Sequence, residues 1–93
     1  MDPARTESQP TAIRQLVVPD LGIVGLPLTI SLWLVPAGSS VQEGDRVVEL
    51  SVGGATCDLE SPVSGRLLRQ LVDEDDVVTP GTVIAEFGTT EVA

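Results

Sequence analysis

Apolar and polar residues alternate in short runs through most of this chain, and prolines or glycines separate the runs. No stretch shows the three-to-four-residue apolar spacing of an amphipathic helix. Short runs bounded by turn residues at intervals of roughly eight to twelve residues are typical of all-β domains. The pattern therefore predicts one small all-β domain.

The clearest predicted element is a hairpin over residues 47–60. Its centre, Val52-Gly53-Gly54-Ala55, carries the Gly-Gly pair favoured in two-residue turns that need positive φ angles. Pairing 52 with 55 gives one apolar face, with Val48 opposite Leu59, Leu50 opposite Cys57 and Val52 opposite Ala55. The other face is mostly polar, with Val47 opposite Glu60, Glu49 opposite Asp58 and Ser51 opposite Thr56. Such a division predicts a half-buried antiparallel hairpin.

A second pattern is an internal repeat with a shift of 37 residues. Residues 34–50 laid over residues 71–87 match Leu, Val, Val, Gly and Glu at 34/71, 35/72, 41/78, 44/81 and 49/86. Two similar halves that each carry strands favour two pseudo-symmetric sheets closing over one core. In the strand predicted from Arg66 to Val72, Arg69 falls on the parity of Leu67 and Leu71, which predicts a β-bulge.

Composition divides the chain into three parts. Residues 1–13 have the composition of a disordered tail, residues 14–88 hold the folded domain, and residues 89–93 form a C-terminal tail. The amino-terminal residues lack the apolar segment of a secretory signal. The uncharged stretch 21–42 is interrupted by glycines and prolines before it reaches the length of a membrane helix. We therefore expect a cytoplasmic protein without a membrane span.

The charge of the chain limits its partners. Fourteen acidic residues stand against five arginines, which gives a net charge of −9. These arginines are too few and too scattered to form the positive stripe that nucleic acid requires, and the net charge disfavours anionic membranes. The 93 residues include no lysine and no histidine, and the single cysteine, Cys57, excludes an internal disulfide.

Six short motifs follow one another in an order and spacing that resemble the lipoyl domain of 2-oxo acid dehydrogenase complexes and its relative, the biotinyl carrier domain. They are Val17–Gly22, the strand from Trp33 to Val41, Glu43-Gly44-Asp45, Ala55-Thr56, Ser61–Gly65, and Asp75–Val78 with Pro80-Gly81-Thr82. The likeness covers about residues 15–87. It implies a flattened β-barrel, or barrel-sandwich hybrid, of two four-stranded antiparallel sheets with pseudo-two-fold symmetry.

The resemblance also shows a departure at the hairpin tip. In that family a lysine carries lipoate or biotin eight residues before the proline of a Pro-x-Ser-Gly turn. Counting eight residues back from Pro62 reaches Gly54, so the family's Asp-Lys-Ala is Gly53-Gly54-Ala55 here. Attachment needs a primary amine on a long flexible stem, which glycine does not supply. We therefore expect no bound cofactor and no catalytic residue.

The segment from Leu21 to Leu28 is about five residues longer than its equivalent in the second half. The resemblance implies that this loop lies beside the lysine hairpin, helps partner enzymes to recognise the domain, and is usually polar. Here it is apolar, and the candidate partner-docking residues are Leu21, Ile23, Val24 and Leu26. These side chains either fold back onto the end of the barrel or form an exposed patch that docks a partner or a second copy.

Other candidate sites have structural explanations. The run Asp73-Glu74-Asp75-Asp76 lacks the ligand spacing of a calcium loop and predicts a solvated turn, so we expect no metal site. Cys57 pairs inward and is expected to be a small buried side chain without a neighbouring base. Glu49 and Asp58 share the outer face of the hairpin, where carboxylates are normally only solvated.

The sequence therefore predicts a lipoyl-like domain that cannot be lipoylated or biotinylated and that acts as a non-catalytic protein-binding or structural module. Its expected partner is a protein, such as a component of a 2-oxo acid dehydrogenase or carboxylase complex, and the chain is expected to be a monomer or weak homodimer. The alternative is a carrier domain of an acyltransferase or carboxylase whose prosthetic lysine is lost or engineered away. A barrel of a membrane-fusion adaptor normally has a helical hairpin between its halves, and this chain has a two-residue turn. An independent enzyme is disfavoured because no nucleophile and base converge.

Overall fold

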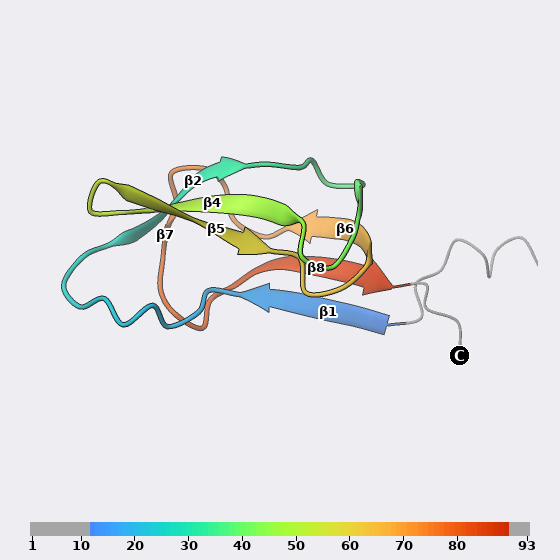
Figure 1. Ribbon diagram of the computed structural model, residues 1–93, viewed down its shortest axis with the longest axis horizontal. Coiled ribbons are helices and arrows are strands. Elements are labelled where there is room, and N and C mark those ends of the chain that lie inside the picture. Colours follow the sequence, from blue (N-terminus) through green and yellow to red (C-terminus); the bar gives the residue numbers. More distant parts are fainter. Residues whose placement is uncertain (1–11, 90–93) are drawn as a thin grey trace, which may run out of the picture.

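The computed structural model describes residues 12–89, and these residues form strands and no helix (Figure 1). The strands are β1 (Ala12–Val17), β2 (Leu28–Trp33), β3 (Ser40–Val41), β4 (Arg46–Val52), β5 (Ala55–Glu60), β6 (Gly65–Gln70), β7 (Val77–Val78) and β8 (Val83–Thr89). They pair into two four-stranded antiparallel sheets, in the orders β1-β8-β6-β3 and β5-β4-β2-β7. This arrangement confirms the predicted all-β barrel-sandwich fold.

The two sheets are related by the predicted internal repeat. Strands β6, β7 and β8 each begin 37 residues after β2, β3 and β4, respectively. The remaining strands, β1 and β5, are both six residues long and correspond to each other. Replacing each strand of the first sheet by its equivalent reproduces the order of the second sheet, so the halves have the expected pseudo-two-fold symmetry.

Two hydrogen bonds that cross between the halves obey the same symmetry. The indole Nε1–H of Trp33 donates to the Val72 carbonyl over 3.1 Å, and the Gln70 amide Nε2–H donates to the Val35 carbonyl over 3.0 Å. The 37-residue shift takes Trp33 to Gln70 and Val35 to Val72, so the two bonds are equivalent. Each half therefore donates a hydrogen bond from the end of one strand to a backbone carbonyl of the other half. These bonds hold the two sheets together as one unit.

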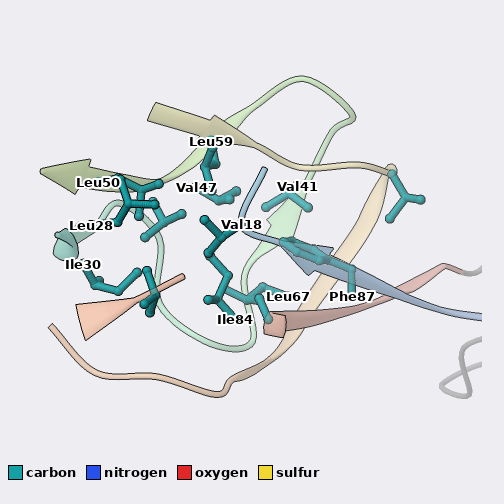
Figure 2. Packing of buried hydrophobic residues seen from close by; sticks show 14 of the residues in the cluster. Val18, Leu28, Ile30, Val41, Val47, Leu50, Leu59, Leu67, Ile84 and Phe87 are labelled. Carbon is teal, nitrogen blue, oxygen red and sulfur yellow. The ribbon is translucent and has the colours of Figure 1, made fainter. Parts of the chain in front are cut away.

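The core lies between the sheets and is aliphatic except for Phe87 (Figure 2). Its largest fully buried side chains include two equivalent pairs, Ile30 with Leu67 and Leu50 with Phe87. Each such side chain contributes about 1.5–3 kcal/mol when it is removed from water. The repeat therefore places the main stabilising residues at matching positions of both sheets.

The register of the β4–β5 hairpin confirms five of the six predicted pairs, from Val48–Leu59 to Val52–Ala55. The sixth prediction, Val47 opposite Glu60, is wrong. A bulge between Arg46 and Val48 leaves Glu60 opposite Arg46, and both Val47 and Val48 are completely buried. A bulge bends its strand and re-aims one side chain, which here allows two consecutive valines to enter the core of a curved sheet.

The bulge predicted around Arg69 is present. Leu67 pairs with Phe87 and Arg69 pairs with Glu86, so β6 has one residue more than β8 at this point. The extra residue turns Arg69 outward, where its guanidinium lies 3.7 Å from the Glu86 carboxylate. At the ends of the described chain, Ala12 of β1 pairs with Thr89 of β8. The paired strands therefore extend slightly past the predicted domain bounds of 14 and 88. The rest of the two predicted tails lies outside the described residues.

Candidate functional site at the hairpin end

The β4–β5 hairpin projects at the end of the barrel opposite to the start of β1 and the end of β8 (Figure 1). Its turn residues Gly53 and Gly54 have φ angles of +53° and +88°, as the predicted two-residue turn requires. A Cβ atom at Gly54 would meet no atom within 4 Å beyond its chain neighbours. The position that corresponds to the family's carrier lysine therefore stands free of the barrel.

The loop between β1 and β2, residues 18–27, lies at the same end as the hairpin (Figure 1). Val18 anchors its start: it is buried, donates its N–H to the Thr82 carbonyl over 2.9 Å and accepts from the Gly81 N–H over 2.8 Å. Further along, the Gly22 N–H donates to the Asp20 carboxylate over 2.8 Å. These bonds fix the loop where it leaves the sheet.

The four candidate docking residues have different environments. Leu21 packs partly against the core, whereas Ile23, Val24 and Leu26 are 45%, 94% and 51% exposed. Leu26 reaches the hairpin tip, because a methyl group placed on Gly53 would lie only 2.9 Å from its Cδ1 atom. The loop therefore does both things that the sequence left open: Leu21 folds back onto the barrel, and the other three residues present apolar surface beside the hairpin.

A small recess of about 120 Å³ opens between this loop and the strand β7. Among its lining residues only Thr79 has a polar side chain, and backbone groups supply further polar surface; the other lining residues are Leu21, Ile23, Leu26, Pro27, Leu28, Val77, Val78 and Pro80. Val77 is 68% exposed, so it belongs to the surface and not to the core. The sequence reasoning missed the contribution of Val77 and Pro80. A signal was available, because the 37-residue shift puts them at the positions of the polar residues Ser40 and Glu43.

Every charge at this end of the barrel is negative. Within the loop 18–27, the tip 52–55 and the segment 75–82, the charged residues are Asp20, Asp75 and Asp76. The four arginines of the described residues lie elsewhere: Arg46 and Arg69 face Asp58 and Glu86, the Arg66 guanidinium donates to the Gly38 carbonyl over 2.6 Å, and Arg14 lies on β1. The charged residues in the segments that form the recess are thus all acidic.

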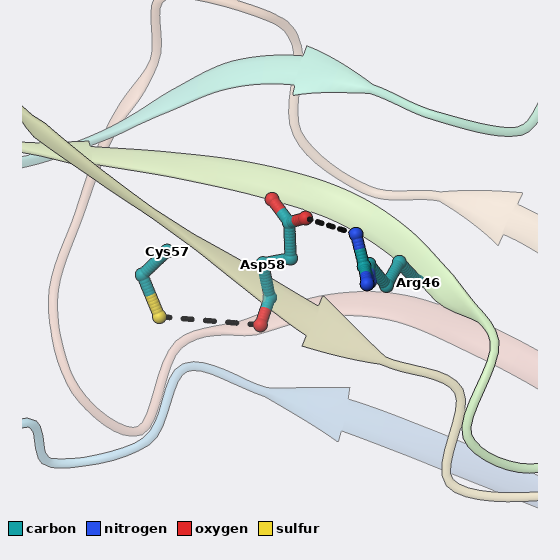
Figure 3. Close-up of polar contacts among 3 residues, drawn as sticks. All are labelled: Arg46, Cys57 and Asp58. Carbon is teal, nitrogen blue, oxygen red and sulfur yellow. Dashed lines mark hydrogen bonds and ion pairs between the residues drawn. The ribbon is translucent and has the colours of Figure 1, made fainter.

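The hairpin carries the two carboxylates that the sequence singled out, Glu49 and Asp58, and Figure 3 shows Asp58 beside Arg46. The Asp58 carboxylate lies 3.8 Å from the Arg46 guanidinium, and Glu49 accepts a hydrogen bond from the Ser31 hydroxyl over 3.0 Å. Cys57, which the sequence predicted to be buried, is only half-buried, and its Sγ lies 3.9 Å from the Asp58 carbonyl oxygen. These contacts explain the three residues as parts of the fold. The contacts do not bring the three side chains together in a common pocket.

The acidic turn after β6 is held by hydrogen bonds between its carboxylates and backbone N–H groups. The Asp73 N–H donates to the Asp76 carboxylate over 2.8 Å, and the Glu74 carboxylate accepts from the Trp33 N–H over 3.0 Å. Asp75 has a φ of +76°, matching Gly38, its equivalent in the first half. Within residues 12–89 no three His, Cys, Asp or Glu side chains are arranged to hold a metal ion, and no described helix could cross a membrane.

The two pseudo-symmetric sheets, one of which extends into a hairpin with an unobstructed position at Gly54, define a domain of the biotinyl and lipoyl attachment type. The family described as "Biotin-requiring enzyme", which covers biotin- and lipoyl-attachment domains, matches residues 14–87. The chain belongs to this family.

Curated relatives agree with this assignment. The dihydrolipoyllysine-residue acetyltransferase component of the pyruvate dehydrogenase complex of Corynebacterium glutamicum is 34% identical over 82 residues, which is 88% of this chain and 12% of that protein. The corresponding component from Mycobacterium bovis is 33% identical over 75 residues, or 81% of this chain and 14% of the relative. The chain thus spans only a small part of the length of these relatives.

Among solved structures, a single-chain, multi-domain long-chain acyl-CoA carboxylase superposes with a TM-score of 0.71 at 24% identity, covering 89% of this chain and 8% of the carboxylase. At this identity the likeness supports the fold alone. The family and the fold are therefore established, and the role of the hairpin end has to be argued from its residues.

Proposed function

We propose that this chain is a lipoyl/biotinyl-type domain that is not acylated and that serves as a non-catalytic protein-binding module. The observation that carries the proposal is Gly54 at the free tip of the hairpin, in a sequence of 93 residues without lysine. An amide to lipoate or biotin needs a primary amine, and no side chain here provides one. What the hairpin end offers instead is apolar surface.

The proposed docking residues are Leu21, Ile23, Val24 and Leu26, together with the tip Gly53-Gly54. Exposed apolar side chains gathered on one surface of a small protein mark interaction sites more often than scattered ones do. The proposed partner is a protein, such as a component of a 2-oxo acid dehydrogenase or carboxylase complex. The dehydrogenase choice is supported by the named relatives, which are components of pyruvate dehydrogenase complexes. We place this function in the cytoplasm.

A second candidate function is favoured by the same relatives. Here the chain would be a carrier domain of an acyltransferase or carboxylase whose prosthetic lysine has been lost or engineered away. The two functions differ in one property, because only a carrier lineage would be modified when an amine is returned to the tip.

Intact-mass spectrometry tests the first function directly. The chain is expressed together with a lipoate ligase and, separately, with a biotin ligase, and we expect its mass to remain that of the unmodified polypeptide. Any added lipoyl or biotinyl mass would contradict the proposal. A known lipoyl domain in the first expression and a known biotinyl carrier domain in the second show that each ligase is active.

Association is tested with Leu26→Asp, which puts a charge into the proposed docking surface. We expect complexes detected by pull-down or light scattering to be lost. Leu32→Asp is the matched control, since Leu32 is 45% exposed on β2 and does not line the recess. Association that survives Leu26→Asp, or that is lost equally in both variants, would contradict docking at this end.

A further inference from the structure

The pseudo-symmetry supplies an internal comparison for the recess. The other end of the barrel has an equivalent hollow, whose lining includes Ser40, Gln42, Glu43 and Asp45. A shift of 37 residues takes these positions to Val77, Thr79, Pro80 and Thr82. The fold therefore accepts polar and charged residues at these sites, yet the hairpin end carries none of the acidic ones. Its apolar character is not a requirement of the fold.

The size of the recess limits what can enter it. Its volume is about 120 Å³. An apolar cavity of about 150 Å³ accepts a benzene ring, so this recess suits one branched aliphatic side chain better than an aromatic one. Thr79 is the one lining residue with a side-chain hydrogen-bonding group, so a polar guest would find few side-chain partners to replace its hydrogen bonds to water.

The surrounding charges limit what can flank that side chain. Asp20 lies just before the loop residues of the recess, and Asp75 and Asp76 come directly before Val77. No basic residue occurs in these segments. A partner with Lys or Arg beside its aliphatic residue would be attracted, and a second copy of this chain, with the same acidic end and a net charge of −9, would be repelled.

We propose that the recess at the hairpin end binds an extended segment of a partner protein through one Val, Ile or Leu side chain flanked by Lys or Arg. This inference rests on the proposed function, because it specifies the chemistry of the partner that docks at that same surface. The aliphatic side chain fills the space between Leu26 and Val77, and the flanking cations face Asp20 and Asp75.

Selection of peptides tests this chemistry without knowledge of the natural partner. A phage-displayed library of random linear peptides is selected on the full chain attached through its terminus, since the described chain begins and ends away from the hairpin (Figure 1). Individual peptides are then synthesised and their affinities measured by fluorescence anisotropy. We expect the selected peptides to share one aliphatic residue with Lys or Arg nearby, and their binding to weaken as salt rises from about 0.05 to 0.5 M.

Two variants of the chain identify the binding residues. Val77→Ser converts the recess to its polar equivalent, and since Ser40 occupies that position in the first half, the variant should fold. We expect it to weaken peptide binding by about tenfold. Asp75→Asn removes one charge and keeps a residue that tolerates positive φ, and should weaken binding by about two- to fivefold. Leu32→Ser, which changes an exposed leucine outside the recess, should leave binding unchanged.

Each other outcome overturns the inference. Peptides with acidic or aromatic consensus residues, binding that is insensitive to Val77→Ser, or no enrichment at all would each contradict it. A dimer of the chain seen by light scattering and lost in Val77→Ser would show that the occupant is a second copy. The proposed function fails separately, when the chain is acylated or when Leu26→Asp leaves protein association intact.

Discussion

Contact between Leu26 and Gly53 is the link between the long loop and the hairpin, and its strength can be measured. The perturbation is Gly53→Ala, with Gly54→Ala as the neighbouring control. Both glycines have positive φ angles, so each substitution costs about 1–2 kcal/mol through backbone strain. Only the methyl group at 53 also meets Leu26, at 2.9 Å from Cδ1, whereas the methyl at 54 meets nothing within 4 Å.

The size of the additional effect follows from how much of Leu26 is buried. Full burial of a leucine side chain contributes about 1.5–3 kcal/mol. Leu26 is 51% exposed and Cδ1 is the free end of its flexible side chain, so displacing it from the hairpin forfeits at most about 1 kcal/mol. Because the two φ angles differ, the costs of the two single substitutions cannot be compared directly. A double-mutant cycle with Leu26→Ala isolates the contact from the backbone strain.

The assay is urea unfolding of the wild-type chain, the three single variants and the two double variants. We expect a coupling energy of about 0.5–1 kcal/mol between Gly53→Ala and Leu26→Ala, because the clash disappears once Cδ1 is gone. The coupling between Gly54→Ala and Leu26→Ala should stay within about 0.3 kcal/mol, the usual limit for independent sites. Equal couplings at 53 and 54, or none at 53, would refute the idea that Leu26 rests on the hairpin tip.

Three further substitutions test the fold that supports this site. Asp75→Gly should raise the melting temperature by about 2–6 °C, because relief of its positive φ is worth about 0.5–1 kcal/mol; a decrease would contradict this. Gly65→Ala should lower stability by about 2 kcal/mol or more, since the new methyl group overlaps the Gly88 carbonyl oxygen, and a neutral result in urea unfolding would refute that close approach. Arg46→Ala should change the unfolding free energy by less than about 0.5 kcal/mol, because its pair with Asp58 is solvent-exposed, whereas a loss above about 1 kcal/mol would indicate a tighter pair.

The proposed loss of the carrier lysine and the proposed binding recess both concern how accessible the hairpin tip is. In a carrier domain the hairpin tip has to remain accessible to several active sites. In this chain Leu26 lies against Gly53, so the tip is partly occupied by the chain's own loop. A tip that no longer carries a cofactor can accept such a neighbour, which is consistent with the proposed change from carrier to docking module.

Several features of this protein followed from the sequence alone, because they depend on local order along the chain. Alternation of apolar and polar residues around Gly53-Gly54 determined the hairpin and most of its register, since each strand has one side facing the core. The 37-residue repeat determined the symmetry of the two sheets. The parity of Arg69 indicated the bulge in β6. The absence of lysine is a property of the sequence itself.

Other features were decided only when the sheets packed. The bulge that buries both Val47 and Val48 depends on the curvature of the closed barrel, which alternation along one strand does not contain. The recess depends on closure as well, because its walls come from loop residues such as Leu26 and from Val77, about fifty residues later in the chain. Local pattern specifies which side of a strand is apolar, and only the pairing of distant strands determines which exposed apolar residues meet.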